Sequence, residues 1–259
     1  MIGNRGIGKN SNGNSPKDEN FEEFEFLSGS LGQTWPNLEE GIRLYNEKQW
    51  NKALEDFLSL DASGLSSEEL SELAYYLGLC YTKLEMYDDA LMYLEQVVAT
   101  AEDVLRVYQC RLVLAYIYIV TKRARLAEFE LKRLQGNGFE SPQLYNALAY
   151  AAWSQKRYKN AIELYEKALE IDNNNTTAMN SIGFILADTG IDILRGLRLC
   201  KRAVDNKPQN AAYLDSLGWA HFKSGNMVEA RTWLRRALEL APGEEEIIRH
   251  LKIVTGETV

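Results

Sequence analysis

Gly3, Gly8 and Lys9 have the spacing G-x-x-x-x-G-K of a loop that binds nucleotide phosphates. Such a loop needs a strand before it and a helix after it, because backbone N–H groups and the helix dipole together hold the phosphate. Here only two residues precede Gly3, and Asn10 stands where a Ser or Thr would hold the metal. The sequence that follows, SNGNSP, is typical of coil. We therefore interpret the match as accidental.

Few other side chains are suited to catalysis. His221 and His250 belong to no metal-binding or nucleophile motif, and His221 occupies a position that faces a neighbouring helix. Cys80, Cys110 and Cys200 lack C-x-x-C spacing and lie within apolar helical patterns, which is typical of buried cysteines in a reducing compartment. The sequence predicts a protein that is not an enzyme, with no catalytic residue, no cofactor and no metal site.

The composition is that of a globular protein of 259 residues, 46% hydrophobic and 25% charged. Its 29 basic and 37 acidic residues give a formal net charge of −8, which would repel a nucleic-acid backbone. No run of about 18 apolar residues occurs, and no apolar segment follows the first basic residues, so neither a membrane span nor a signal peptide is predicted. We expect a soluble, cytoplasmic protein; the alternative is an exported or lipid-anchored protein whose signal sequence has been removed.

Small residues recur through the chain in two series. The first series is Gly41, Gly78, Ala115, Ala149, Gly183 and Gly218. The second series, twelve residues further on and thirteen in the fifth copy, is Ala53, Ala90, Ala127, Ala161, Gly196 and Ala230. Small side chains at both places let two antiparallel helices approach closely, so each copy is predicted to be a helical hairpin. The interval of 34 to 37 residues between copies is typical of a stacked helix-pair solenoid.

These copies resemble the tetratricopeptide repeat (TPR) family, from about Thr34 to Gly243. The fourth copy, YNALAYAAWSQKRYKNAIELYEKALEIDNNN, carries the family's residues Tyr145, Leu148, Ala149, Tyr158, Ala161, Tyr165 and Ala168. The last copy adds Gly225 and Pro242, whereas Arg111 stands where an aromatic residue is usual. The last two copies look like the closing repeats of bacterial TPR adaptor proteins, many of which are exported or lipid-anchored.

The resemblance implies an all-α fold, a right-handed α-solenoid of about six TPR hairpins with a C-terminal capping helix. We expect the solenoid at residues 34–242, with repeats starting near 34, 71, 108, 142, 176 and 211. Residues 243–259 are predicted to form the capping helix, whose first turn is acidic. Residues 1–33, rich in Gly, Asn and Ser up to Ser15, are predicted to be a flexible N-terminal segment.

One part of that N-terminal segment, KDENFEEFEFLSGSLG, combines acidic and aromatic residues. Phe21, Phe24 and Leu27 would share one side of a short helix. Two interpretations stay open. The segment is a tether that packs on the first repeat, or it is a recognition segment that binds a partner or this protein's own groove.

In the TPR family, the first helix of each hairpin lines a concave face that binds protein segments. The resemblance therefore implies a peptide-binding groove. Its predicted residues are Tyr45, Tyr75, Leu79, Tyr116, Asn146, Tyr150, Trp153, Asn180, Phe184, Asp215, Trp219 and Phe222. Aromatic rings are typical interface anchors, and an Asn amide can bond a peptide backbone. The alternative for any single ring is that it belongs to the core.

The leading hypothesis is a non-catalytic scaffold or adaptor that binds a protein or peptide segment in this aromatic groove. Because few basic residues lie on the predicted face, we expect an apolar or mildly basic segment. A second hypothesis is a structural homo-oligomer, whose mass in solution would exceed 29.5 kDa. A third, binding of single-stranded RNA by helical repeats, is disfavoured by the acidic charge balance.

Overall fold

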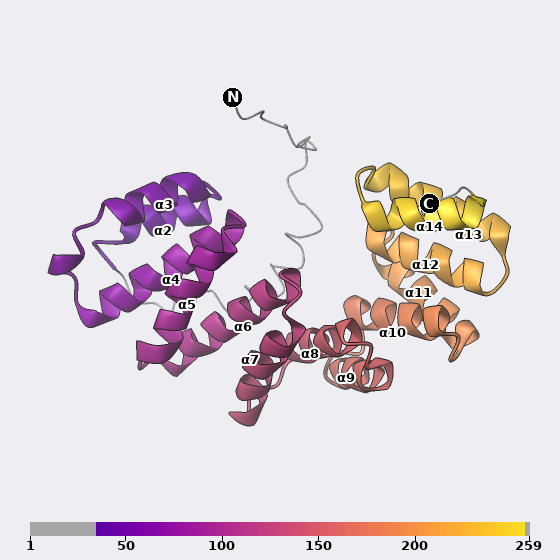
Figure 1. Ribbon diagram of the computed structural model, residues 1–259, viewed down its shortest axis with the longest axis horizontal. Coiled ribbons are helices and arrows are strands. Elements are labelled where there is room, and N and C mark those ends of the chain that lie inside the picture. The colour runs from indigo at the N-terminus through magenta and orange to yellow at the C-terminus, as the bar shows by residue number, and fades with distance from the viewer. Residues whose placement is uncertain (1–34, 257–259) are drawn as a thin grey trace. The chain divides into compact units, whose positions relative to one another are not determined.

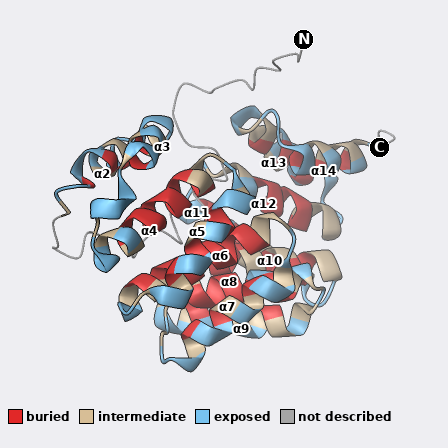
Figure 2. Cartoon of the chain, turned by 60° about the vertical axis from the view of Figure 1, so that its left-hand side comes forward, coloured by how far each residue is buried: buried red, intermediate tan, exposed pale blue. Residues whose placement is uncertain are grey.

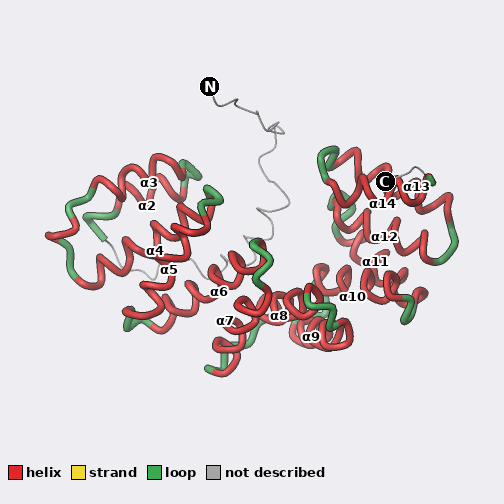
Figure 3. The backbone as a smooth tube through the Cα atoms, viewed as in Figure 1, coloured by secondary structure: helices red, strands yellow, loops and turns green. Residues whose placement is uncertain are grey.

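The structure, a computed structural model, describes residues 35–256 as α-helices joined by short connections (Figures 1 and 3). The α-helices are α2 (Glu39–Asn46), α3 (Trp50–Ser59), α4 (Ser67–Lys83), α5 (Tyr87–Thr100), α6 (Val104–Val120), α7 (Ala124–Gly136), α8 (Pro142–Ser154), α9 (Tyr158–Ile171), α10 (Thr176–Thr189), α11 (Ile193–Asn206), α12 (Ala211–Lys223), α13 (Met227–Leu240) and α14 (Glu245–Thr255). A short 3-10 turn, η1 (Ala62–Gly64), precedes α4. Between residues 35 and 256 there is no β-strand, and the prediction of an all-α solenoid is confirmed. The phosphate-loop match and the segment from Phe21 to Leu27 lie outside the described residues.

The chain divides into two compact units, with unit 1 ending at Leu134 and unit 2 beginning at Gln135. In unit 1, α2 packs on α3, α4 packs on α5, and α4 and α6 each pack on the helix before them. In unit 2, the pairs α8 and α9, α10 and α11, and α12 and α13 form hairpins that pack on one another in chain order. Helix α14 closes unit 2 by packing on α13 and α12.

Residues at the helix starts specify where several helices begin. The Ser66 hydroxyl accepts a hydrogen bond from the Glu69 N–H, and the Glu69 carboxylate accepts one from the Ser66 N–H. This reciprocal pair is a capping box, and it sets the first turn of α4. Ser141 caps α8 in front of Pro142, and Asn210 caps α12 in the same way. The helix boundaries therefore follow from local sequence as well as from packing.

Buried residues lie on the helix faces that meet within each unit (Figure 2). In unit 2, one hydrophobic cluster draws residues from all five helices between α10 and α14, among them Met179, Cys200, Leu217, Ala237 and Ile247. Because each helix buries one face in this shared core, each hairpin of the cluster depends on its neighbours for part of its buried apolar surface.

Among the glycines of the two series, those of the fifth hairpin, Gly183 and Gly196, lie closest to the facing backbone. A Cβ placed on Gly183 would lie 2.9 Å from the Cys200 backbone nitrogen and 2.9 Å from the Gly196 carbonyl oxygen. A Cβ on Gly196 would lie 2.6 Å from the Gly183 carbonyl oxygen. The extra residue of this copy lengthens α10 beyond its small residue: α10 ends at Thr189, six residues after Gly183, whereas α12 ends at Lys223, five residues after Gly218. Glycine replaces the usual alanine at 196 because two backbones meet there.

The turn inside several hairpins contains a residue in the left-handed backbone region. Lys122 and Lys156 have a φ of 61°, and Gly225 holds the same place in the last hairpin with a φ of 85°. A residue with a side chain is strained in that region by about 1–2 kcal/mol. Glycine is free of this strain, but it loses about 0.5–1 kcal/mol more backbone entropy on folding than alanine does.

Lys122→Gly and Lys156→Gly are therefore each expected to raise the free energy of unfolding, by about 0.5–1 kcal/mol. Urea unfolding followed by circular dichroism measures the change. Lys201→Gly, at an exposed position in the middle of α11, is the matched control and should lower the free energy of unfolding by about 1 kcal/mol. A loss of stability in the two turn variants would show that these turns carry no strain.

The three cysteine thiols are buried, and their burial predicts low reactivity. Burial raises the pKa of Cys80, Cys110 and Cys200 to about 12. Because only the thiolate reacts, a thiol-specific reagent at pH 8 should label none of the three in the folded protein and all three in denaturant. Rapid labelling of any of them without denaturant would contradict their burial.

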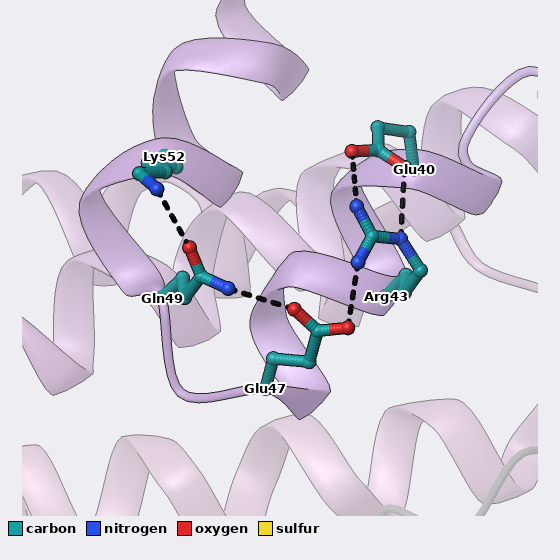
Figure 4. A network of polar contacts seen from close by, with 5 residues as sticks. All are labelled: Glu40, Arg43, Glu47, Gln49 and Lys52. Atoms are coloured by element: carbon teal, nitrogen blue, oxygen red, sulfur yellow. Dashed lines mark hydrogen bonds and ion pairs between the residues drawn. The ribbon is translucent and has the colours of Figure 1, made fainter.

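An exposed polar network connects α2 to the start of α3 (Figure 4). Arg43 donates hydrogen bonds to Glu40 at 2.6 and 3.0 Å and to Glu47 at 2.6 Å, and Gln49 links Glu47 to Lys52. Because these side chains are exposed, water screens their attraction, and the network adds little stability. It marks a solvated surface.

Candidate functional site

In unit 1, the predicted site residues are buried. The exposed fractions are 6% for Tyr45, 1% for Tyr75, 0% for Leu79 and 5% for Tyr116. Tyr45 and Tyr75 both pack edge-on against Tyr76, at 5.6 and 5.4 Å between ring centroids. These four residues offer no exposed surface to a ligand, so the candidate site lies in unit 2.

A buried ion pair lies beside those rings. Arg106 on α6 donates to Glu72 on α4 and to Gln109, both at 2.6 Å, and its guanidinium lies 3.9 Å from the Tyr75 ring centre. Burial raises the pKa of Glu72, although Arg106 acts in the opposite direction. With every partner supplied by the protein itself, this cluster joins α4 to α6 and has a structural role.

In unit 2, five predicted residues form two groups of neighbouring rings, which we together call the aromatic row: Tyr150 and Trp153 on α8 with Phe184 on α10, and Trp219 with Phe222 on α12. Ring centroids are 5.3 Å apart for Tyr150 and Trp153, and 6.5 Å apart for Trp153 and Phe184. Trp219 and Phe222 are 5.0 Å apart. Tyr150 is 41% exposed, and Trp153, Phe184 and Phe222 are half-buried. The row therefore presents apolar surface to solvent.

His250 completes the row from α14. Its ring stacks on Trp219 at 4.2 Å and lies 6.3 Å from Phe184. Its Nδ1 lies 2.9 Å from an Asp215 carboxylate oxygen, and both side chains are buried. The C-terminal helix thus contributes to the predicted site as well as closing the core.

The sequence contains a signal for His250 that the six-copy repeat frame does not include. The predicted site positions Asn180 and Asp215 are 35 residues apart, and His250 follows after another 35. Extending the frame by one period places His250 at the same helical position, on a seventh first helix.

The charged groups beside the row already have partners. Asp188 accepts a hydrogen bond from the Trp219 indole N–H at 2.9 Å and pairs with Lys223 at 3.3 Å. Lys223 also lies 5.4 Å from the Trp219 ring centre. Burial, and then the negative charge of Glu246 on α14, raise the pKa of Tyr150. Because Asp188 and Asp215 both have partners within the protein, the row is mainly an apolar surface.

Two asparagines on the first helices have unsatisfied oxygens. The Asn146 amide donates to Asn175 Oδ1, and the Asn180 amide donates to the Ser216 hydroxyl, both at 3.1 Å. The Oδ1 atoms of Asn146 and Asn180 are buried and have no hydrogen-bond partner among the described residues. A buried acceptor without a donor lowers the free energy of unfolding by about 1–3 kcal/mol. Two such acceptors at equivalent repeat positions therefore need an explanation, and a donor from a ligand would provide one.

His221, on α12, is half-buried, and its Nδ1 has no hydrogen-bond partner in the part of the chain that the structure describes. Burial, with Lys201 acting in the same direction, lowers its pKa, and Glu229 acts in the opposite one. The two charged groups that act on it, Lys201 and Glu229, lie on α11 and α13, and His221 is not part of the aromatic row.

Models of the family described as "Tetratricopeptide repeat" match residues 72–101, 142–175 and 192–245. The stacked hairpins make the protein an α-solenoid of helix-pair repeats. The chain belongs to the tetratricopeptide repeat family.

Curated relatives match part of the chain. A TPR repeat-containing protein of Pseudomonas aeruginosa is 33% identical over 78 residues, which are 30% of this chain and 13% of that protein. The human mitochondrial import receptor subunit TOM70 is 30% identical over 105 residues, 40% of this chain and 17% of that protein. The chain thus spans less than a fifth of the length of these relatives.

Solved structures share the fold at low identity. The APC/C hetero-tetramer Cut9-Hcn1 has a TM-score of 0.68 at 14% identity, covering 92% of this chain and 46% of that one. YrrB, described as a TPR protein with an unusual peptide-binding site, has a TM-score of 0.52 at 17% identity, covering 78% of this chain and 97% of that one. No helix within residues 35–256 is both long and apolar enough to cross a membrane.

Proposed function

We propose that this protein is a non-catalytic adaptor whose unit 2 binds an apolar or mildly basic protein segment along the aromatic row. Proteins of this repeat family are in general protein–protein interaction scaffolds without catalytic activity. The observation that carries the proposal is the row itself, in which Tyr150 is 41% exposed and Trp153, Phe184 and Phe222 are half-buried.

The chemistry of the row favours an apolar segment with a free backbone. An apolar side chain that covers half-buried rings removes their apolar surface from water, which favours binding. Aromatic anchors of this kind contribute about 2 kcal/mol or more to the binding free energy when they fill a pocket. The Oδ1 atoms of Asn146 and Asn180 are buried, so a backbone N–H of the segment would reach them only if the two amides turn toward the segment on binding. Asp188 and Asp215 are paired within the protein, which leaves little charge to attract a strongly charged ligand.

Similar proteins support a binding role without identifying the partner. YrrB has a peptide-binding site by its own description, and TOM70 is an import receptor subunit. At these identities and lengths, they support the class of function only.

The experiment compares the immobilised parent with a Tyr150→Ala, Trp153→Ala, Phe222→Ala variant. A matched control variant carries Leu58→Ala, Met92→Ala and Phe129→Ala, which remove exposed apolar side chains of unit 1. Circular dichroism first establishes equal helicity and melting, and mass spectrometry then identifies the proteins captured from native extract. A partner held by the parent and the control but lost by the row variant supports the proposal; equal capture by all three contradicts it.

A further inference from the structure

The second helices of the last two hairpins carry an exposed basic surface in an otherwise acidic protein. Between residues 191 and 242 there are nine basic and five acidic residues, whereas the whole chain has a net charge of −8. Arg198, Lys201 and Arg202 on α11, and Arg231 and Arg235 on α13, are all exposed. We call these five residues the basic strip. None of them forms an ion pair within residues 35–256, in contrast to Arg195, which pairs with Glu166.

The two helices repeat one arrangement of apolar and basic side chains. On α11, Leu194 lies one turn before Arg198 and is 66% exposed. On α13, Val228 lies one turn before Arg231 and is 73% exposed. Residues three or four apart share a helix face, so each face presents an apolar residue followed by cations.

Contacts within unit 2 hold the two helices in a fixed relation. Cys200 and Val204 of α11 share a core cluster with Ala237 of α13. Arg236 of α13 also donates a hydrogen bond to the Pro208 carbonyl, in the connection that follows α11. The two basic faces therefore belong to the same compact unit, on helices other than those of the aromatic row.

We propose that the basic strip is a docking surface for the chain's own acidic-aromatic segment, residues 18–27. That segment, DENFEEFEFL, contains five carboxylates and three phenylalanines. Its carboxylates are complementary to the five cations, which form no ion pair within residues 35–256, and its phenylalanines suit the exposed Leu194 and Val228. An acidic segment of this kind would not suit the aromatic row, so this inference stands independently of the proposed function.

The test uses the full chain with its own segment disabled by Glu22→Gln, Glu23→Gln, Phe24→Ser and Glu25→Gln, so that it does not compete. A fluorescent peptide of residues 17–28 is titrated into this protein, and anisotropy gives the dissociation constant. Adding Arg198→Ser, Lys201→Ser and Arg202→Ser should weaken binding at least tenfold. The control, Lys52→Ser, Arg125→Ser and Lys159→Ser, removes as much positive charge elsewhere and should change binding less than twofold.

Binding should also weaken several-fold between 50 and 500 mM salt, because the contact is between exposed charges. Equal weakening by the strip and control substitutions would overturn the proposal, as would failure of the peptide to bind. Loss of binding in a Trp153→Ala variant, with the strip substitutions neutral, would place the segment on the aromatic row instead. Strip-dependent binding to phosphatidylglycerol vesicles without peptide binding would identify a membrane as the occupant and would also overturn it.

Discussion

Glu72→Ala is expected to lower the free energy of unfolding by about 4 kcal/mol, because it leaves the guanidinium of Arg106 charged and buried without its partner. The side chains of the pair are only 7% and 8% exposed, and their atoms are 2.6 Å apart. Water is therefore unable to replace the lost carboxylate. Urea unfolding followed by circular dichroism measures the loss.

The matched control for this prediction removes both charges. A double variant, Glu72→Leu with Arg106→Met, leaves no buried charge, and its stability should lie within about 1 kcal/mol of the parent. If Glu72→Ala alone costs less than about 1 kcal/mol, the pair is solvated and α4 does not pack on α6 as closely as the structure has it.

Gly183→Ala is the second large effect, with an expected loss of about 3 kcal/mol. The added Cβ would lie 2.6 Å from the Cys200 sulfur and 2.9 Å from two backbone atoms of α11. Backbone atoms do not move aside as a flexible side chain does, so α10 and α11 must separate and expose their shared core.

Gly136→Ala provides the comparison. A Cβ at Gly136, in the last turn of α7, would meet nothing within 4 Å, so alanine's better helix propensity should leave stability unchanged or raise it by up to about 1 kcal/mol. Thermal melts of both variants separate the two effects. Equal melting temperatures for Gly183→Ala and the parent would contradict the close approach of the two helices.

The hairpin architecture was predictable because its signals are local or strictly periodic. The two series of small residues marked where helices cross, and a methyl group added at Gly183 or Gly196 would lie within 3 Å of backbone atoms of the facing helix. The capping residues Ser66 and Ser141 marked where two of the helices start. These features depend on neighbouring residues and on a fixed period, which a sequence displays directly.

Burial of the predicted site residues was not predictable in the same way. Tyr75 and Tyr150 lie on the first helices of their hairpins, yet one is 1% exposed and the other 41% exposed. The difference depends on what packs beside each ring: Arg106 covers Tyr75, while no cation among residues 35–256 covers Tyr150 in this way. The exposure of such a ring depends on side chains about 30 residues away in the sequence, and the residue pattern of its own helix does not reveal them.

Photo-crosslinking tests the central claim most directly. The photoreactive analogue p-benzoyl-L-phenylalanine replaces Tyr150 in the aromatic row or, as a control of similar exposure, Phe129 on α7. With a captured partner present, irradiation should link a segment of that partner to position 150 and not to position 129. Links that form equally at both positions, or only at 129, would show that the partner binds elsewhere and that the aromatic row is not its site.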